Sequence, residues 1–177
     1  MSGAKDYAEA LFSLAEELSI TERVLADTEV CCAVFEKNPT YASLADTPAM
    51  GISEKLSLID EAFSSVDENV KNLIKILSER HSVHEFVKIA KELRKIYDED
   101  RGIMRAEVIS ARPISERQLD TLKQKLGALT GKTVVLKSTI DTSILGGIKL
   151  RYMGKQLDAS LRSRLDAIER GLKDTVL

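Results

Sequence analysis

Two adjacent glycines, Gly146 and Gly147, stand between two apolar runs in the sequence DTSILGGIKLRY. Glycine lets backbone N–H groups approach an anion without a Cβ in the way, so one hypothesis is a phosphate-binding loop. A dinucleotide-binding loop needs three glycines between a strand and a helix, whereas residues 148–152 alternate like a strand. The spacing therefore favours a structural role, in which the pair opens a strand by permitting a positive φ or a bulge.

A second possible phosphate site is the sequence TGKT at residues 130–133, which is similar to the end of a P-loop. The P-loop motif requires an earlier glycine at the position where Leu126 stands. A P-loop also runs from a strand into a helix, but the pattern here predicts a helix followed by a strand. We therefore expect Gly131 to terminate the preceding helix and to bind no phosphate.

The two histidines and the two cysteines are the other side chains with obvious reactive chemistry. His81 and His84 have no partnered nucleophile in an identifiable motif, and no ligand spacing of a known zinc type includes them. Cys31 and Cys32 are neighbours in a helical pattern, where adjacent side chains point in different directions, so we expect no disulfide between them. The carboxylates lie at helical spacing from lysines, which solubility alone explains. We expect no catalytic residue, no metal and no cofactor.

The composition indicates a soluble globular protein. Of 177 residues, 44% are hydrophobic and 31% are charged, which is enough for a sizeable core in one or two domains. The longest apolar run, residues 30–35, is far shorter than the roughly 20 residues that a membrane-spanning helix needs. The first residues, MSGAKDYAEALF, resemble neither a secretory signal nor a transit peptide. We therefore expect no direct membrane insertion and a reducing cytosolic environment.

The two halves of the sequence have opposite net charges. Residues 1–100 contain 11 Lys and Arg against 20 Asp and Glu, a net charge of −9, whereas residues 101–177 contain 15 against 8, a net charge of +7. This asymmetry predicts two modules that face different partners, although two solvated surfaces of different composition would show it as well.

A basic half can bind nucleic acid through phosphate contacts. However, the only aromatic residue after Tyr97 is Tyr152, and binding of single strands without sequence preference relies on aromatic side chains on which bases stack. A stand-alone nucleic-acid-binding module that uses the basic half is the alternative function.

Residues 5–97 have apolar residues at three- and four-residue spacing, with breaks near residues 38, 47 and 64. This pattern predicts about six helices with short connections, and therefore an antiparallel bundle. The expected helices span residues 4–19, 21–37, 39–45, 52–63, 67–80 and 83–100.

The first and fifth of these helices have broad apolar faces. The apolar arc covers about 200° in the first helix and about 160° in the fifth, whereas the stripe of a surface helix covers roughly 100°. Two interpretations stay open. Either both helices are central in the bundle, or a groove between them accepts an amphipathic helix from a partner.

After residue 102 the pattern changes from helical to mixed. Ser115 and Gln118 form a capping box, in which each side chain accepts a backbone N–H of the other residue, and so predict the start of a helix. Asp158 or Ser160 can cap a second helix. The expected order is a strand at 104–110, a helix to about 129, strands at 133–139, 148–152 and 155–157, and a helix to about 173.

The sequence therefore predicts an α+β protein of two domains. Residues 1–101 are expected to form a six-helix bundle. Residues 102–177 are expected to form a small α/β domain with a four-stranded sheet and two helices. The predicted boundary coincides with the change in net charge.

The sequence DTSILGGIKLRYMGKQLDASLRSRL, residues 141–165, resembles the C-terminal signature of the delta subunit of F-type ATP synthases, whose mitochondrial counterpart is the oligomycin-sensitivity-conferring protein. Residues 7–12, 38–39, 72–80 and 106–118 are also similar to this family, so the resemblance covers essentially the whole chain. Met153 departs from it, because the family usually has glycine there and this chain has Gly154, which predicts a shifted turn. The matching signature positions are Asp141, Ser143, Gly146, Gly147, Arg151, Asp158, Ser160 and Leu165.

The resemblance implies a non-catalytic stator subunit. In this family the helical domain holds the N-terminal segments of the alpha subunits, and the smaller domain attaches the C-terminal helices of the b subunits of the peripheral stalk. The catalytic head then resists the torque of the rotor during proton-driven ATP synthesis. The implied location is the cytoplasmic face of the bacterial cell membrane, as a peripheral part of the synthase, and the isolated chain is expected to be a monomer.

The resemblance also assigns roles to two sets of residues. The broad faces of the first and fifth helices become a groove for an alpha-subunit helix, although a position in the core predicts the same residues. The expected groove residues are Tyr7, Leu11, Phe12, Leu14, Leu73, Ile76 and Leu77. The signature residues Asp141, Gly146, Gly147, Arg151, Asp158 and Ser160 are expected to be structural.

Overall fold

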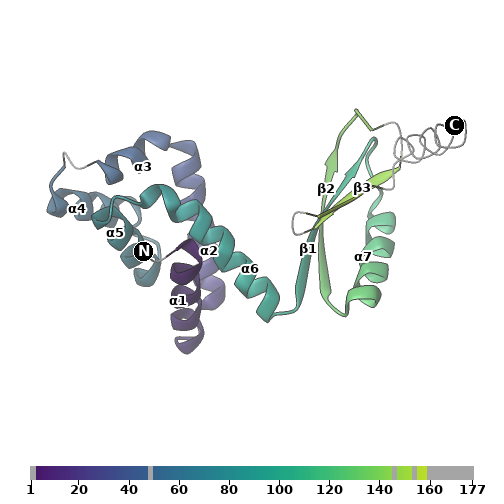
Figure 1. Ribbon diagram of the computed structural model, residues 1–177, viewed down its shortest axis with the longest axis horizontal. Coiled ribbons are helices and arrows are strands. Elements are labelled where there is room, and N and C mark those ends of the chain that lie inside the picture. The colour runs from purple at the N-terminus through teal and green to yellow at the C-terminus, as the bar shows by residue number, and fades with distance from the viewer. Residues whose placement is uncertain (1–2, 48–49, 145–146, 153–154, 159–177) are drawn as a thin grey trace, which may run out of the picture. The chain divides into compact units, whose positions relative to one another are not determined.

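The computed structural model describes residues 3–47, 50–144, 147–152 and 155–158 (Figure 1). The chain divides into two compact units, Met1–Tyr97 and Asp98–Leu177. The predicted boundary was after residue 101, whereas the division falls inside the last helix of the first unit. Within the second unit, Arg105 donates from Nε to both carboxylate oxygens of Asp98, at 2.9 and 2.8 Å.

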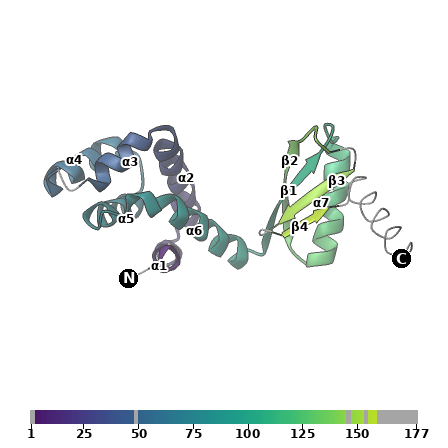
Figure 2. The ribbon, with the colours of Figure 1, turned by 45° about the horizontal axis from the view of Figure 1, so that its top comes forward.

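The first unit is helical, as predicted (Figures 1 and 2). Its helices begin and end within a few residues of the predicted positions. The helix predicted at residues 83–100 begins as a short 3-10 helix, η1, and continues as an α-helix. The elements are α1 (Ala4–Glu17), α2 (Thr21–Lys37), α3 (Pro39–Asp46), α4 (Ile52–Ala62), α5 (Glu68–Glu79), η1 (Val83–Glu85) and α6 (Phe86–Asp100).

Local sequence fixes several helix starts. Pro39 occupies the first turn of α3, where its missing N–H costs no hydrogen bond. Asp67 caps α5, because its side chain accepts the backbone N–H of Asn69 at 3.0 Å. The backbone N–H of Asp67 in turn donates to the Asp27 carboxylate of α2 at 2.7 Å. The cap therefore also fixes the start of α5 against α2.

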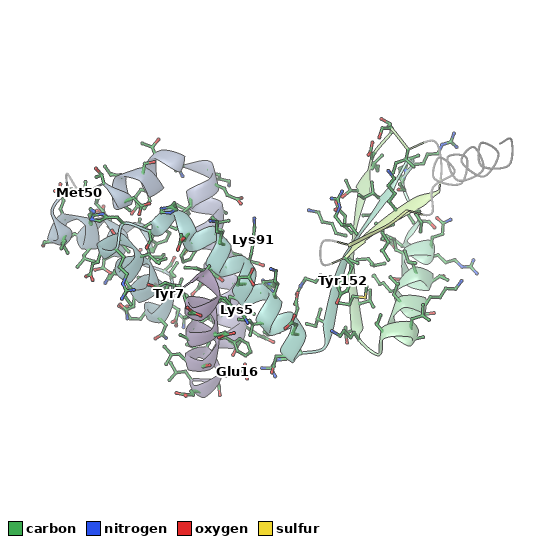
Figure 3. All side chains as sticks on the ribbon, viewed as in Figure 1. Lys5, Tyr7, Glu16, Met50, Lys91 and Tyr152 are labelled. Atoms are coloured by element: carbon green, nitrogen blue, oxygen red, sulfur yellow. The ribbon has the colours of Figure 1, made fainter. Side chains whose placement is uncertain are left out.

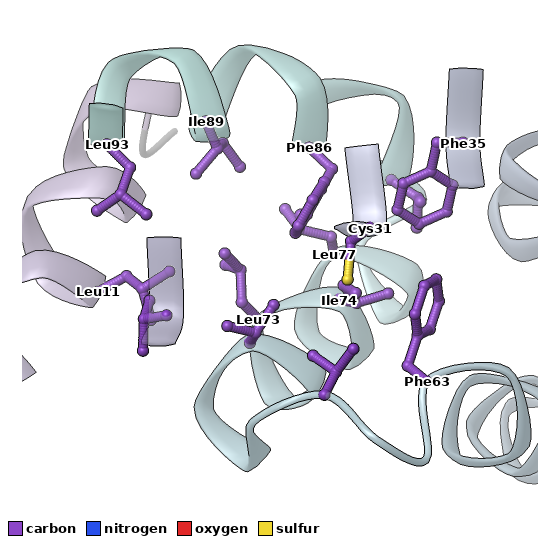
Figure 4. Packing of buried hydrophobic residues seen from close by; sticks show 14 of the residues in the cluster. Leu11, Cys31, Phe35, Phe63, Leu73, Ile74, Leu77, Phe86, Ile89 and Leu93 are labelled. Atoms are coloured by element: carbon purple, nitrogen blue, oxygen red, sulfur yellow. The ribbon is translucent and has the colours of Figure 1, made fainter. Parts of the chain in front are cut away.

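The core of the helical unit contains a cluster of three phenylalanines (Figure 4). The ring centroid of Phe35 in α2 lies 5.6 Å from that of Phe63, which follows α4, and 5.4 Å from that of Phe86 in α6. Leu77 of α5 is fully buried in the same core. These separations are typical of favourable aromatic pairs, so the cluster joins helices that are distant in sequence.

The two histidines, one before η1 and one within it, make hydrogen bonds with Asp46 at the end of α3. The Asp46 carboxylate accepts the backbone N–H groups of Val83 and His84 at 2.6 and 3.2 Å, and His84 Nδ1 lies 2.8 Å from Asp46 Oδ2. His81 Nδ1 lies 2.8 Å from the Asp46 carbonyl oxygen, which can only accept. Asp46 thus holds α3 against η1, and both histidines stabilise this contact.

The second unit is a small α/β unit, as predicted. Its described elements are β1 (Ile103–Ser110), α7 (Glu116–Thr130), β2 (Thr133–Ile140), β3 (Ile148–Tyr152) and β4 (Lys155–Asp158). The strands form a sheet of order β2-β1-β3-β4, in which β1 and β2 are parallel and the other pairs are antiparallel. The helix that was predicted after residue 158 and the turn at residues 153–154 lie outside the described residues.

The ends of α7 follow the sequence signals. Ser115 Oγ accepts the Gln118 backbone N–H at 3.4 Å, and Gln118 Oε1 accepts the Ser115 backbone N–H at 3.1 Å. Gly131 ends the helix with φ of +67°, a conformation that costs glycine little. The P-loop hypothesis for residues 130–133 is therefore excluded by the order of elements, since α7 leads into β2.

Candidate partner-binding site

The seven residues predicted to line a groove on α1 and α5 divide into three groups. Leu14 is 40% exposed and Ile76 is 43% exposed. Leu11, Leu73 and Leu77 are buried in the core and lie too deep to supply much contact area to a partner. Tyr7 and Phe12 are partly buried against the core.

A hydrogen bond joins the start of α1 to the end of α5. Arg80, which follows the last residue of α5, donates from Nη1 to the Tyr7 hydroxyl oxygen at 2.9 Å. Figure 3 shows Tyr7 on the part of α1 next to α5. Leu11 and Leu73 occupy neighbouring positions in the core below (Figure 4). The start of α1 and the end of α5 are therefore in contact.

An apolar strip runs along the outer side of α1. Tyr7, Ala10, Leu14 and Leu18 recur at three- and four-residue spacing, which places them on one face of a helix. Leu18 is 52% exposed and was missed by the sequence-based list of groove residues, although it belongs to the same apolar arc. Ile76 lies one helical turn before Arg80, which contacts Tyr7, and we call the four α1 residues together with Ile76 the α1–α5 strip. Apart from the Tyr7 hydroxyl, its side chains are aliphatic, and it suits an amphipathic helix.

The signature residues of the second unit shape the connection between β2 and β3. The Asp141 carboxylate accepts the backbone N–H of Ser143 at 2.9 Å and its hydroxyl at 2.6 Å, and these hydrogen bonds lower the pKa of Asp141 below its ordinary value. The turn places Ile144 in the core, where it is buried. Gly147, just before β3, has φ of +83°, so the interpretation of a strand entry with a positive φ is confirmed for this glycine.

Arg151 links two strands of the sheet. Its Nη1 donates to Glu107 Oε2 at 2.9 Å, and Glu107 Oε1 accepts the Thr139 hydroxyl at 2.7 Å. The network therefore spans β3, β1 and β2. Asp158 ends β4 and pairs in register with Lys149, whereas Gly146 and Ser160 lie outside the described residues.

Replacement of Gly147 by valine is expected to destabilise the second unit by roughly 1–3 kcal/mol, because a β-branched residue is strained at positive φ. The measurement is urea unfolding of the full chain, compared with Gly147→Ala as the milder substitution. An unfolding midpoint for Gly147→Val equal to that of the wild type would show that the positive φ is not required.

The comparison with known protein families decides the identity of the chain. The model of the family described as ATP synthase delta (OSCP) subunit matches residues 4–172. The chain belongs to this family. The resemblance inferred from residues 141–165 is thus confirmed, and the delta-family assignment extends over both units.

Individual relatives agree with the delta-family assignment. The chain is 31% identical over 170 residues to the ATP synthase subunit delta of Geobacillus sp. (strain WCH70), with 96% of each chain covered. It is 32% identical to that of Priestia megaterium over 170 residues, which cover 96% of this chain and 94% of the relative. A chain of the mitochondrial ATP synthase hexamer of Toxoplasma gondii has the same fold, with a TM-score of 0.73, 19% identity and coverage of 97% and 98%.

The cysteines of this delta-family chain are poor nucleophiles. Cys31 and Cys32 are free thiols. Burial raises the pKa of Cys31 to about 12, and burial with the nearby Glu36 carboxylate raises the pKa of Cys32 to about 11. Because the thiolate is the reactive and metal-binding form, both side chains are inert at neutral pH.

Two further structural findings concern metals and membranes. Among the described residues, no group of three or more His, Cys, Asp or Glu side chains could hold a metal ion. Within the same part of the chain, no helix combines the length and the apolar character needed to cross a membrane.

Proposed function

We propose that this chain is the stator subunit that joins the catalytic head of an F-type ATP synthase to its peripheral stalk. The helical unit binds the N-terminal segment of an alpha subunit, and the α/β unit attaches the C-terminal helices of the b subunits. The observation that carries the proposal is the exposed α1–α5 strip in a chain that the delta family matches from residue 4 to residue 172.

The α1–α5 strip has the form of a site for a helix. Leu14, Leu18 and Ile76 leave 40 to 52% of their surface exposed, so complete burial by a partner contributes for each about half of the roughly 1.5–3 kcal/mol expected for a whole side chain, before ordering costs. The strip lies over a well-packed core, so binding requires little rearrangement of the helices. A short amphipathic helix fits these requirements.

The α/β unit offers a different surface for the stalk. A cleft of about 560 Å³ runs beside α7 and is lined by residues of α7, by the loop that precedes it and by the start of β3. Arg112 and Lys125 contribute positive charge, and Leu122 and Ile148 contribute apolar surface. Two units with different surfaces suit a protein that must hold two partners at once and so prevent the head from turning.

The same proposal also specifies the location and the oligomeric state of the protein. The chain takes no direct part in catalysis and lies at the cytoplasmic face of the bacterial membrane through its partners. When isolated, it is a monomer, because its apolar strip serves a different chain. Nucleic-acid binding receives no support, because the family model and the named relatives are those of ATP synthase delta subunits.

The proposal is tested by calorimetric titration of the full chain with a peptide from the N-terminus of the same organism's alpha subunit. We expect saturable one-to-one binding with a negative heat-capacity change, since apolar surface is buried. A peptide of the same composition in scrambled order is the control. The absence of binding by a folded monomer, shown by sedimentation and circular dichroism, would refute the alpha-subunit assignment.

A further inference from the structure

One cation beside the α1–α5 strip differs from all others on these two helices. Lys5 of α1 pairs with Glu9 at 3.3 Å. On α5, Lys71 pairs with Glu68 at 2.7 Å and Lys75 with Asp60 at 2.6 Å. Within the described residues, Arg80 at the end of α5 has the Tyr7 hydroxyl as its partner and no carboxylate.

The other arginines of the helical unit support the contrast. Arg94 of α6 forms an ion pair with Glu29. Arg23 of α2 lies 3.8 Å from carboxylate oxygens of both Asp27 and Asp67. Across the described part of this acidic unit, Arg80 is thus the arginine whose charge is not matched by an acidic side chain.

We infer that Arg80 recognises a carboxylate on the helix that occupies the α1–α5 strip. The inference rests on the proposed function and adds the chemistry of the partner, namely an amphipathic helix with Asp or Glu beside one end of its apolar ridge. Tyr7 holds Nη1 of the guanidinium, and the exposed side chain keeps further N–H donors for a planar, charge-assisted contact.

The position of Arg80 gives this contact a specific role. The residue lies at the C-terminal end of α5, where the helix dipole favours positive charge, and it marks one end of the strip. The strip itself is apolar and does not distinguish the two directions in which a helix can lie. A single fixed cation at one end sets the direction, because the reversed helix would leave its carboxylate away from Arg80.

The test uses the full chain and the alpha-subunit N-terminal peptide in a double-mutant cycle. Arg80→Gln is expected to weaken binding roughly tenfold, and Arg80→Lys is expected to restore part of the loss. In parallel, each Asp or Glu of the peptide is changed singly to its amide. One such peptide should bind wild-type protein about tenfold more weakly and should lose no further affinity with Arg80→Gln.

The matched control is Arg117→Gln, which removes the same charge from the exposed start of α7 in the other unit and should leave the affinity unchanged. If every amide peptide binds the wild type as tightly as the parent peptide does, the inference is overturned, whether or not Arg80→Gln folds. If Leu14→Asp abolishes binding but Arg80→Gln does not weaken it, the strip is the binding site and only the role of Arg80 is refuted. If the parent peptide does not bind at all, the proposed function itself has failed.

Discussion

Leu14→Asp is expected to weaken binding of the alpha-subunit peptide by at least about 100-fold while the protein stays folded. Leu14 is in the middle of the α1–α5 strip and is 40% exposed, so the free protein can keep the new carboxylate in water. In the complex the carboxylate would be buried against an apolar ridge without a partner, which costs several kcal/mol, and about 1.4 kcal/mol is a factor of ten in affinity. The measurement is the same calorimetric titration.

The matched control for this prediction is Leu129→Asp. Leu129 is 82% exposed on α7 in the other unit, so the substitution adds the same charge without touching the helical unit. Its affinity for the peptide should equal that of the wild type. Equal affinities for Leu14→Asp and wild type would show that the peptide binds elsewhere, because no helix can occupy the strip without covering Leu14.

The choice of Leu14 shows where prediction from the sequence ends. Periodicity places Leu11 and Leu14 in one broad apolar arc, and nothing in the arc shows which edge packs on the core. The structure buries Leu11 and leaves Leu14 exposed. Leu11→Asp would therefore place a charge in the core, and a loss of binding would report unfolding as much as a lost contact. The arc alone could not separate the interpretation of a central helix from that of a groove.

Features set by neighbouring residues were predicted well. The capping box of Ser115 and Gln118 and the end of α7 at Gly131 depend on contacts within one turn, and such signals are legible in the sequence. A positive φ was one of the options that the place of Gly147 before a strand left open, and the structure shows it.

Features set by distant residues were not predicted. The junction of Asp46 with η1 brings together residues 37 and 38 positions apart, and the contact between Arg151 and Glu107 spans 44 positions. The hydrogen bond between Arg80 and Tyr7 spans 73. No periodic pattern encodes such pairs, because each depends on how whole helices and strands pack. The sequence therefore indicated which residues matter in the signature without showing what they contact.

The largest effect on stability is expected for Phe86→Ala. Phe86 is fully buried at the start of α6 and packs 5.4 Å from Phe35 between ring centroids. Removal of a buried phenylalanine ring costs about 3–5 kcal/mol through lost burial and the cavity that remains, which is a large share of the stability of a small domain. Urea unfolding of the full chain, followed by far-ultraviolet circular dichroism, measures the loss as a lower midpoint of the helical unit.

Phe86→Leu serves as the companion variant, because it keeps much of the volume and should cost clearly less than the alanine. We expect a larger loss of stability for alanine than for leucine because the Phe86 ring forms one side of the aromatic cluster that joins α2, α4 and α6. Phe35 also contacts Phe63, so a void at residue 86 weakens the whole cluster. Equal and small losses for both variants would mean that the site collapses around the missing ring. The packing below the α1–α5 strip would then be plastic, and a partner helix would bind a surface that adapts to it.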